Sequence, residues 1–370
     1  MTAGLFRPTV AVVDLDAVRH NVRALKPKAA ELMAVVKANG YGHGDIPVAR
    51  AALEAGASWL GVALVEEGLR LRDAGIDAPI LVLSEFPRGS EKEALAARLT
   101  PTVYTDDGLL ALTDAAATMG RPSPVHVKVD TGMHRAGVAP ELALRLCLRI
   151  AEAGLELEGV WTHFAAADEP EDPSVREQLD RFHRVLTDLE GAGIRPRYRH
   201  AANSAAVLAL PRSHLDLVRV GIALYGIAPG PALEDWADLL PAMSLRSQVA
   251  LVKRVAAGEG VSYGLRYRLE RDSTVATVPV GYADGYHRAA SGRAHVLIRG
   301  HRHQVAGTVT MDQITVDCGD DPVQSGDEVV LLGKQGDQQI RAEEVAVWAG
   351  TIGYEVVCSV SERVPREYRG

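Results

Sequence analysis

The sequence of 370 residues predicts an α/β fold: an N-terminal (β/α)8 barrel of the TIM type, followed by a second, mostly β domain. Two observations predict it. Apolar, β-branched runs alternate with segments of helical periodicity through the first two thirds of the chain. After about residue 235, short strands and regular turn signals replace this alternation. We therefore expect domains at 1–235 and 236–370, with residues 1–15 pairing with the second domain.

Eight buried strands are expected in the barrel. They lie near residues 33–37, 59–64, 79–84, 100–104, 125–130, 158–163, 198–203 and 217–221. Segments between them, such as "VEEGLRLRDAG" and "PELALRLCLRIAEAG", place apolar residues three and four apart and end in a glycine, where a helix should stop. Eight alternations of this kind are typical of a (β/α)8 barrel.

The composition excludes several classes of protein. The net charge of −8 is spread along the chain without a basic block, which argues against nucleic acid or an anionic membrane as the main partner. No apolar run is long enough to span a bilayer, and "MTAGLFRPTV" lacks a basic region before an apolar one, so we expect a cytoplasmic protein. Cys147, Cys318 and Cys358 lie far apart, and each is expected to be a small buried hydrophobic residue.

Polar side chains gather at the predicted carboxyl ends of the barrel strands, where the active sites of this fold form. The first strand is expected to end on Lys37, and the chain continues through Gly40, Gly42 and Gly44 in "AVVKANGYGHG". These glycines allow positive φ angles and a close approach of the backbone to a ligand. Tyr41 adds a hydroxyl to the same loop.

Four other strand ends carry polar groups as well. They supply Lys128, Asp130 and Arg135 (fifth strand), His163 (sixth), His200, Asn203 and Ser204 (seventh) and Arg219 (eighth). Ser204 and free N–H groups at Gly221 and Ile222 fit a phosphate site, which commonly follows the seventh and eighth strands of this fold. A phosphate on one side and a lysine amine on the other is the layout required for pyridoxal phosphate held as a Schiff base.

The order of the motifs resembles the alanine racemases, a family of pyridoxal 5'-phosphate enzymes with a barrel and a C-terminal β domain. The matching stretches are "AVVKANGYGHG", "KVDTGMHRAG", "HAANSAA", "RVGIALYG", "VSYG", "GYADGY", "TMDQ" and "TIGYEVVC". They cover nearly the whole chain, and the first looks like the family's cofactor-lysine signature. The resemblance implies an isomerase that interconverts L-alanine and D-alanine and supplies D-alanine for peptidoglycan in the bacterial cell wall.

The resemblance also implies two opposed catalytic bases. Lys37 would be the Schiff-base lysine and one base, and Tyr263 of "VSYG" the other. Tyr263 would come from the β domain of a second subunit, so the active sites would lie at the interface of a homodimer. Arg219 would face the pyridine nitrogen of the cofactor, and His163 would link Arg219 to Tyr263.

The remaining roles follow from the same resemblance. Arg135 would contact Tyr263 and the substrate carboxylate, and Lys128, carbamylated in many members, would hold that arginine. The phosphate would be bound by Tyr41, Ser204, Gly221, Ile222 and Tyr354, and the entrance and substrate pocket shaped by Tyr282, Met311 and Asp312 of the partner. Gly353 and Thr310 depart from the family pattern, which usually has asparagine and cysteine there, so the shape of the pocket is open.

The chemistry explains this set of residues. An amino acid joined to pyridoxal phosphate as an imine has an acidified Cα–H, and racemisation then needs a base on each face. Lys37 and Tyr263 are expected to serve the two faces. Arg219 donates a hydrogen bond to the ring nitrogen but does not give up its proton, so side reactions such as transamination should be suppressed.

Four alternatives stay open from the residues alone. A racemase of another small amino acid, such as serine, would differ by few contacts. A non-catalytic pyridoxal phosphate-binding protein would not need the C-terminal 130 or so residues, and a decarboxylase would place an acidic group where Arg219 lies. A metal hydrolase would want paired histidines on the first strand, which "MAVVK" lacks. We expect no catalytic metal, a solvated turn at "HRH" (301–303), and no convergent partner for His126.

Overall fold

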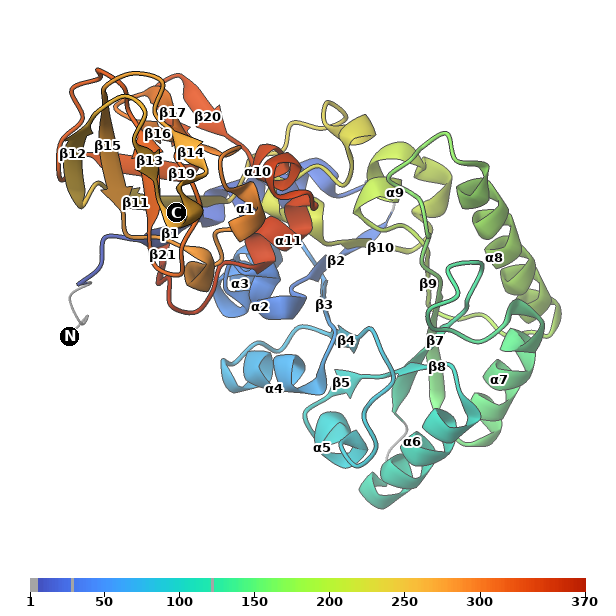
Figure 1. Cartoon of the computed structure of the whole chain (residues 1–370). Helices are drawn as coiled ribbons and strands as arrows, with labels where there is room; N and C mark the ends of the chain where they lie inside the picture. Colours follow the sequence, from blue (N-terminus) through green and yellow to red (C-terminus); the bar gives the residue numbers. More distant parts are fainter. Residues whose placement is uncertain (1–5, 28–29, 121–122) are drawn as a thin grey trace. The chain divides into compact units, whose positions relative to one another are not determined.

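The computed structural model of the chain describes residues 6–27, 30–120 and 123–370 (Figure 1). It divides into two compact units. The barrel unit comprises Val18–Gly40 and Asp45–Leu239, and the β unit comprises the described residues up to Ala17, Tyr41–Gly44 and Leu240–Gly370. Each unit is described by itself below.

Parallel strands form the centre of the barrel unit. They are β2 (Glu31–Val35), β3 (Trp59–Val62), β4 (Ile80–Val82), β5 (Leu99–Thr100), β6 (Thr102–Val103), β7 (Pro124–Lys128), β8 (Glu156–Trp161), β9 (Tyr198–His200) and β10 (Leu217–Val220). Their order is β10-β2-β3-β4-β5 in one sheet and β6-β7-β8-β9 in the other. Pro101, which has no N–H to donate, separates β5 from β6. Backbone bonds from Asp216 N to Arg199 O (3.1 Å) and from Arg219 N to Ala202 O (3.0 Å) join β9 to β10.

Helices follow the strands and lie outside them in Figure 1. They are α1 (Leu15–Leu25, which begins in the β unit), α3 (Asp45–Glu54), α4 (Val65–Asp73), α5 (Glu91–Ala96), α6 (Asp106–Met119), α7 (Pro140–Glu152), α8 (Pro173–Gly191) and α9 (Ser204–Ala209), with 3-10 turns η1 (Pro211–Ser213), η2 (Ile222–Tyr225) and η3 (Pro231–Leu233). The helix ends are capped as the sequence suggests: Thr105 Oγ1 accepts from Gly108 N at the start of α6, and Gly120 ends that helix with a φ of 64°. The predicted (β/α)8 barrel is confirmed.

The barrel strands are packed through large apolar side chains. One buried cluster comprises Met33, Trp59, Leu81, Tyr198 and Leu217, which come from five different strands. Side chains of this size fill the interior of an eight-stranded barrel, so its centre is a packed core. Most of the candidate site residues lie at or beyond the ends of the strands, whereas His126 is a buried polar residue within β7.

The predicted strands extend about two residues too far at their carboxyl ends. We expected the first strand to end on Lys37, but β2 ends at Val35 and Lys37 is the first residue of the short element α2 (Lys37–Tyr41). The apolar run continues through Val36, which is fully buried although it lies beyond the strand. Burial pattern alone therefore does not mark where a strand ends.

A large, mainly antiparallel sheet forms the β unit. Its order is β12 (Leu251–Val255), β15 (Ser273–Val278), β18 (Ile314–Asp317), β17 (His301–Val305), β16 (His295–Ile298), β19 (Glu328–Gln335), β11 (Met243–Gln248), β1 (Val10–Asp14) and β21 (Arg366–Arg369), with β20 (Gln338–Ile340) paired to β19. β1 pairs antiparallel with β11 and parallel with β21. The other elements are β13 (Gly260–Val261), β14 (Tyr267–Arg268), η4 (Tyr263–Leu265), η5 (Tyr282–Asp284), η6 (Arg288–Ala290), α10 (Ala342–Ala349) and α11 (Gly353–Cys358).

The cysteines divide into two groups. Cys147 and Cys318 are buried, and burial raises the pKa of each thiol to about 12, so both remain protonated. Cys358 is exposed, so the prediction that it would be buried is wrong. It lies at the end of α11, where the apolar residues Val356 and Val357 take the buried positions.

Within the described part of the chain, helices that combine the length and the apolar character needed to cross a membrane are absent.

Candidate active site

Lys37 leaves β2 in a left-handed turn. Ala38, Asn39 and Gly40 have φ angles of 52°, 53° and 61°, although they lie within α2. The backbone on both sides of the lysine is held by hydrogen bonds: Ala38 N donates to Glu67 Oε1 (2.6 Å), and the Tyr225 hydroxyl donates to Val35 O (3.0 Å). These bonds fix the point from which the lysine side chain leaves the barrel strand.

Glu67 was not anticipated by the sequence analysis. Its carboxylate is buried and also accepts from Ala63 N (2.8 Å) and Leu64 N (3.1 Å), so it satisfies three backbone donors from two loops. The signal was present, because Glu67 stands three residues after Leu64, the N-cap of α4, where a capping-box acid is expected. That pattern indicates the helix cap, but not the bond to the lysine loop.

The glycines after Lys37 allow backbone conformations that residues with a Cβ rarely adopt. Gly40, Gly42 and Gly44 all have positive φ angles, as predicted. A Cβ on Gly42 would lie 2.2 Å from Val357 O, so within the β unit the close approach is to another part of the backbone. The expected close approach of this loop to a ligand stays a prediction.

Arg219 is a buried hydrogen-bond centre at the end of β10. Its Nη2 donates to Thr162 O (2.6 Å) and Ala201 O (3.0 Å) and lies 3.3 Å from His163 Nδ1, and its Nη1 donates to His200 O and Nδ1 (both 3.1 Å). Burial lowers the pKa of Arg219 to about 9, so the guanidinium remains charged at neutral pH. Its partners fix the plane of the guanidinium at the barrel mouth.

A chain of three polar residues extends from Arg219 into the barrel. Because Arg219 can only donate, His200 Nδ1 accepts and a neutral His200 carries its proton on Nε2. His200 Nε2 lies 2.9 Å from His126 Nδ1, and His126 Nε2 lies 3.3 Å from Glu158 Oε2. Burial is the main cause that lowers the pKa of both histidines. The prediction that His126 has no convergent partner is therefore wrong.

Two cations share one aromatic ring. Lys128 Nζ lies 4.8 Å from the centroid of the Trp161 ring, and Arg219 Cζ lies 4.7 Å from it. Cation–π attraction offsets part of the repulsion between the two charges. Trp161 was not among the predicted site residues, because nothing in "VWTHF" marks its ring as a cation platform.

Burial and neighbouring positive charges lower the pKa of Lys128. The pKa of Lys128 falls to about 8, first because of burial and then because of the charges of Arg135 and Arg219, against which Asp130 acts in the opposite direction. Lys37 adds to the lowering. A lysine of this pKa is partly neutral near physiological pH, so its amine is available as a nucleophile.

His163 is neutral for the same reasons. Burial lowers its pKa well below the ordinary value, and the charges of Arg219 and Lys128 lower it further. A guanidinium cannot accept a hydrogen bond, so the Nδ1 that faces Arg219 Nη2 carries no proton and the neutral ring is protonated on Nε2. His163 therefore presents a hydrogen-bond donor on the side away from Arg219.

The loop that carries Arg135 is held by Asp130. Its Oδ1 accepts from the N–H groups of Gly132, Met133 and His134, all at 3.0 Å. Gly137 closes the loop at a φ of 134°, and a Cβ there would lie 2.6 Å from Asp130 N. Both features restrict where Arg135 can lie.

The predicted phosphate site contains a preformed hydroxyl. Ser204 Oγ is buried and accepts from Gly221 N (2.9 Å) and Ala223 N (3.4 Å), which leaves the hydroxyl proton for an oxyanion. The expectation of a free N–H at Gly221 does not hold, because Ser204 takes it. Ile222 follows as the first residue of η2.

Tyr263 is a well-exposed side chain of the β unit, at 73%. It begins η4 between β13 and β14, with Ser262 and Gly264 at φ angles of 63° and 77°. Its carbonyl accepts from Thr308 Oγ1 (2.9 Å). A tight turn thus presents the phenol outward.

The remaining predicted residues of the β unit form two groups. Tyr282 and Met311 are exposed, and Tyr282 N donates to Thr310 O (3.0 Å), whereas Asp312 pairs with Arg363 (2.8 Å). Tyr354 of α11 and Tyr41 form the other group, with ring centroids 6.3 Å apart. Lys37, Lys128, Arg135, His163, Ser204 and Arg219 belong to the barrel unit.

Both units match family models. The N-terminal domain of alanine racemase matches residues 13–229, and its C-terminal domain matches residues 242–368. An alanine racemase of Symbiobacterium thermophilum is 52% identical, with 98% of both chains covered. Among solved structures, the alanine racemase of Streptomyces lavendulae superposes with a TM-score of 0.94 at 47% identity, covering 98% of this chain and 97% of that one. The alanine racemase of Bacillus anthracis gives a TM-score of 0.92 at 40% identity, covering 100% and 96%.

The fold and these matches define the class first: the chain is a racemase, an isomerase built from an α/β barrel and a C-terminal β domain. It belongs to the alanine racemase family. The sequence-based predictions of the family, the fold class and the type of enzyme are confirmed.

Proposed function

We propose that the protein interconverts L-alanine and D-alanine with pyridoxal phosphate as its cofactor. The observation that carries the proposal is the cluster of cationic groups at the barrel mouth: Arg219 and Lys128 lie 4.7 Å and 4.8 Å from the centroid of the Trp161 ring, and Arg219 Nη2 lies 3.3 Å from His163 Nδ1. The full-length match to the alanine racemase family supports the same conclusion.

The donor set of the barrel unit fits this cofactor. Lys37 offers an amine for the aldehyde, Ser204 a hydroxyl proton for the phosphate, and Arg219 a buried cation for the pyridine nitrogen. We assign the other phosphate contacts to Ile222, Tyr41 and Tyr354, because Ser204 already accepts from the Gly221 N–H. When bound, the cofactor supplies an electron sink that acidifies the Cα–H of the amino acid.

The two bases act on opposite faces of the substrate. We assign one face to the Lys37 amine and the other to the Tyr263 phenol of a second subunit, so that one removes the Cα proton and the other delivers one. The Nε2–H of His163 and the guanidinium of Arg135 stabilise the phenolate form of Tyr263 by donating to its oxygen. We assign these two bases to different chains of a homodimer, with Tyr282, Met311 and Asp312 of the second subunit lining the entrance.

Lys128 is proposed to carry a carbamate. A neutral amine adds CO2 and loses one proton, which converts a cation beside Arg135 into an anion that pairs with it. The pKa of Lys128, about 8, supports the proposal because a substantial share of the amine is neutral near physiological pH. The carbamate then holds Arg135 toward the substrate carboxylate.

The product points to a cellular role. We propose that the enzyme supplies D-alanine for peptidoglycan in the cytoplasm of a bacterium. Restored growth of a bacterial strain that requires added D-alanine, upon expression of this chain, would support the role. Growth that still depends on added D-alanine, despite soluble expression, would contradict it.

The decisive experiment is incubation of the purified protein with L-alanine in heavy water. Chiral chromatography with mass detection should find D-alanine with deuterium at Cα. A parallel incubation with L-serine measures the breadth of the pocket near Thr310 and Gly353. Cofactor bound to protein that produces neither D-amino acid would contradict the proposed activity.

The cofactor lysine has a test that does not depend on turnover. Reduction with borohydride, digestion and peptide mass spectrometry should place the mass of the cofactor on the peptide that contains Lys37. A modified peptide elsewhere, or none from protein that holds the cofactor, would contradict the assignment.

Replacing Tyr263 by phenylalanine tests the second base. The Tyr263→Phe variant should lose racemisation by about 10²- to 10⁴-fold, the usual contribution of a positioned acid or base. Exchange of the D-alanine Cα proton and of the L-alanine Cα proton, each followed by mass spectrometry, should be affected unequally. Normal racemisation in both directions would contradict the role.

A further inference from the structure

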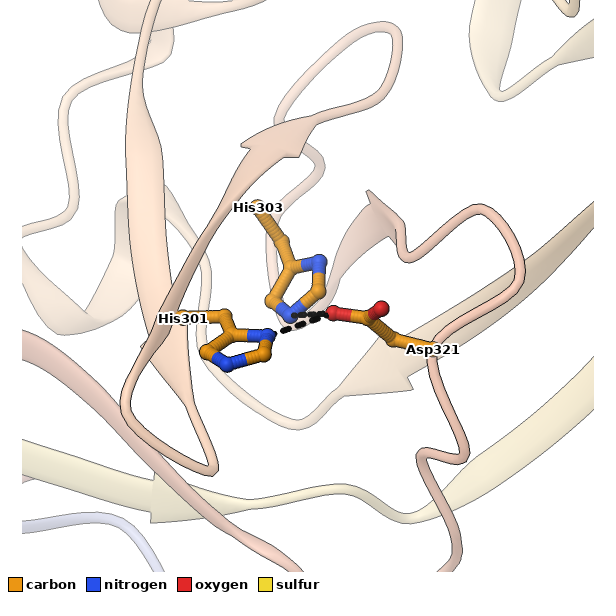
Figure 2. Close-up of side chains that lie close together, drawn as sticks. All are labelled: His301, His303 and Asp321. Atoms are coloured by element: carbon orange, nitrogen blue, oxygen red, sulfur yellow. Dashed lines mark hydrogen bonds and ion pairs between the residues drawn. The ribbon is translucent and has the colours of Figure 1, made fainter.

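Three potential metal ligands lie together in the β unit, apart from every residue assigned above. They are His301 and His303 of β17 and Asp321, which follows β18 (Figure 2). One ligand atom from each lies within 4.8 Å of the other two. The sequence analysis predicted a solvated turn at "HRH", which is wrong because both histidines belong to a strand.

The strand explains why the two imidazoles share a face. Residues two apart in a β-strand point to the same side of the sheet, so His301 and His303 project together while Arg302 points away. β17 pairs antiparallel with β18, with Gln304 opposite Asp317. The segment after β18 therefore returns Asp321 to the level of the histidines.

The carboxylate is held in place by the backbone of its own turn. Asp321 N donates to Cys318 O (3.1 Å), and Val323 N donates to Asp321 O (2.8 Å). Arg299 Nη1 donates to Pro322 O (3.0 Å), which ties the same turn to the start of the β17 hairpin. The site is thus largely formed before any ion binds, which lowers the cost of binding.

The distances suit a metal ion. Asp321 Oδ2 lies 2.8 Å from His301 Nδ1 and 3.5 Å from His303 Nε2. Bonds of about 2.0–2.1 Å in a tetrahedron put neighbouring ligand atoms about 3.3 Å apart. The three ligand atoms lie within 4.8 Å of one another, so the side chains rotate to bring every pair to that spacing when an ion binds.

His303 provides an independent observation. The side chain is 6% exposed, yet its Nε2 is buried without a hydrogen-bond partner among the described residues. A buried polar atom of this kind costs free energy unless something satisfies it. Figure 2 shows this nitrogen facing the Asp321 carboxylate and His301, where an ion would lie.

His303 and Asp321 have protonation states that suit an ion, and the Nδ1 proton that His301 donates to Asp321 leaves when the ion binds. Burial lowers the pKa of His303, so its imidazole is neutral and has a lone pair to give. A hydrogen bond from His301 lowers the pKa of Asp321, so its carboxylate is ionised. His301 is exposed and Asp321 partly so, which gives an ion a path from solvent.

We propose that His301, His303 and Asp321 form a binding site for a divalent transition-metal ion, with zinc as the expected occupant. Two imidazoles and one carboxylate suit zinc and its neighbours, whereas calcium and magnesium favour all-oxygen sites. Three protein ligands leave a fourth position for water. The ion joins β17 to the segment after β18 and stabilises the β unit without taking part in the proposed racemisation.

The test is zinc binding by the untagged, full-length, cofactor-loaded protein. After removal of metals with a chelator, the protein is equilibrated with zinc chloride and desalted, and zinc is counted by elemental mass spectrometry. One zinc per chain should be retained. His301→Gln and Asp321→Asn replace partly exposed side chains, and each should weaken zinc binding by at least about tenfold in competition with a chelator.

The matched control is His20→Gln. His20 also faces a carboxylate, with its Nε2 3.9 Å from Asp238 Oδ2, but it is not part of a three-ligand group in the described residues. This variant should bind zinc as the unaltered protein does. Zinc should raise the midpoint of thermal unfolding of the unaltered protein and of His20→Gln, but not of His301→Gln.

Two results would overturn the proposal. One is a protein that retains much less than one zinc per chain. The other is equal affinity for zinc in the unaltered protein, His301→Gln and Asp321→Asn, which would place the bound ion elsewhere.

Discussion

Buried cations dominate the candidate site at the scale of single residues. Arg219 and Lys128 flank the ring of Trp161, and the pKa values of both are lowered, first of all by burial. Arg219 is compensated by three backbone carbonyls, whereas Lys128 is opposed mainly by other cations. The charge on Lys128 is therefore expected to destabilise the folded protein.

Replacing Lys128 by methionine should stabilise the protein at neutral pH. The folded pKa of about 8 lies below the ordinary value of 10.5, so the folded state holds the proton less tightly. The charged Lys128 therefore destabilises the folded state, and this destabilisation is complete below pH 8. It disappears as the pH rises to about 10.5, because between these two values the lysine is protonated in the unfolded state but largely neutral in the folded state. Lys128→Met should therefore raise the free energy of unfolding at pH 7 by roughly 1–3 kcal/mol.

The measurement is denaturant unfolding in carbonate-free buffer at pH 7 and pH 9.5. The gain from Lys128→Met should shrink at the higher pH, and added bicarbonate should stabilise only the protein that retains Lys128. Lys253→Met, which removes an exposed lysine of β12, is the control and should change stability by less than about 0.5 kcal/mol. A loss of stability at pH 7 in Lys128→Met would contradict this account.

Sequence reasoning found the residue types at this scale but not their partners. Lys37, Arg219 and His163 were selected because each stands at a strand end. Two partners were missed because they are distant in the sequence. Glu67 accepts a hydrogen bond from Ala38, which lies 29 positions away, and His126 is hydrogen-bonded to His200, which lies 74 positions away. Such contacts depend on how the strands are arranged, which no local pattern contains.

At the scale of secondary-structure elements, the loops that follow the barrel strands hold most of the candidate site residues of the barrel unit. The loop after β7 is organised by Asp130 and closed by Gly137. The strand ends were predicted about two residues too late, since apolar residues continue past the last ladder bond. Tertiary packing buries these residues without keeping them in the sheet.

Gly137→Ala should disturb the Arg135 loop. The added Cβ would meet backbone atoms, Asp130 N at 2.6 Å and Val129 C at 2.9 Å, so the loop must move. We expect Gly137→Ala to lower the free energy of unfolding by roughly 2 kcal/mol more than the control Gly154→Ala does, because the added Cβ is strained by the positive φ and also contacts backbone atoms. The KM for alanine should rise, because Arg135 is displaced from the substrate carboxylate.

Gly154→Ala is the matched control. Gly154 also has a positive φ, 73°, but nothing lies within 4 Å of its added Cβ. It should cost only about 1 kcal/mol and leave the KM unchanged. Equal effects of the two substitutions on stability and KM would show that steric contact at Gly137 does not matter.

At the scale of the whole molecule, the proposed catalytic groups belong to different units. Lys37 lies in the barrel unit and Tyr263 in the β unit. The predicted domain boundary between residues 235 and 236 stays a prediction, and the compact units divide between Leu239 and Leu240. If each active site takes its Lys37 and its Tyr263 from different chains, activity requires the dimer.

Mixed dimers test this arrangement. Lys37→Ala and Tyr263→Phe should each be nearly inactive alone. Co-expressed in equal amounts, about half of the dimers are mixed, and one of the two sites in each has both bases, so about a quarter of full activity should return. Tandem affinity purification of the mixed species, through two different tags, measures its activity directly.

The control is the double variant, with both changes in one chain, co-expressed with the unaltered chain. Here the mixed dimer has one altered base in each of its two sites, so it should be nearly inactive. No recovery in the first mixture and a half-active mixed dimer in the second would show that both bases come from one chain.

The sequence by itself determined the architecture and the family. Strand and helix periodicities are local, and the motifs from "AVVKANGYGHG" to "TIGYEVVC" match the family in order, so a barrel, a β domain and the family can be recognised without coordinates, and Lys37 can be proposed as the cofactor lysine. Only the tertiary structure decided how these groups behave. The tautomers of His163, His200 and His126, the lowered pKa of Lys128 and the grouping of His301 and His303 with Asp321 depend on burial and on contacts between distant segments. Those quantities exist only after the chain has folded, because desolvation and Coulomb interaction are functions of distance in space.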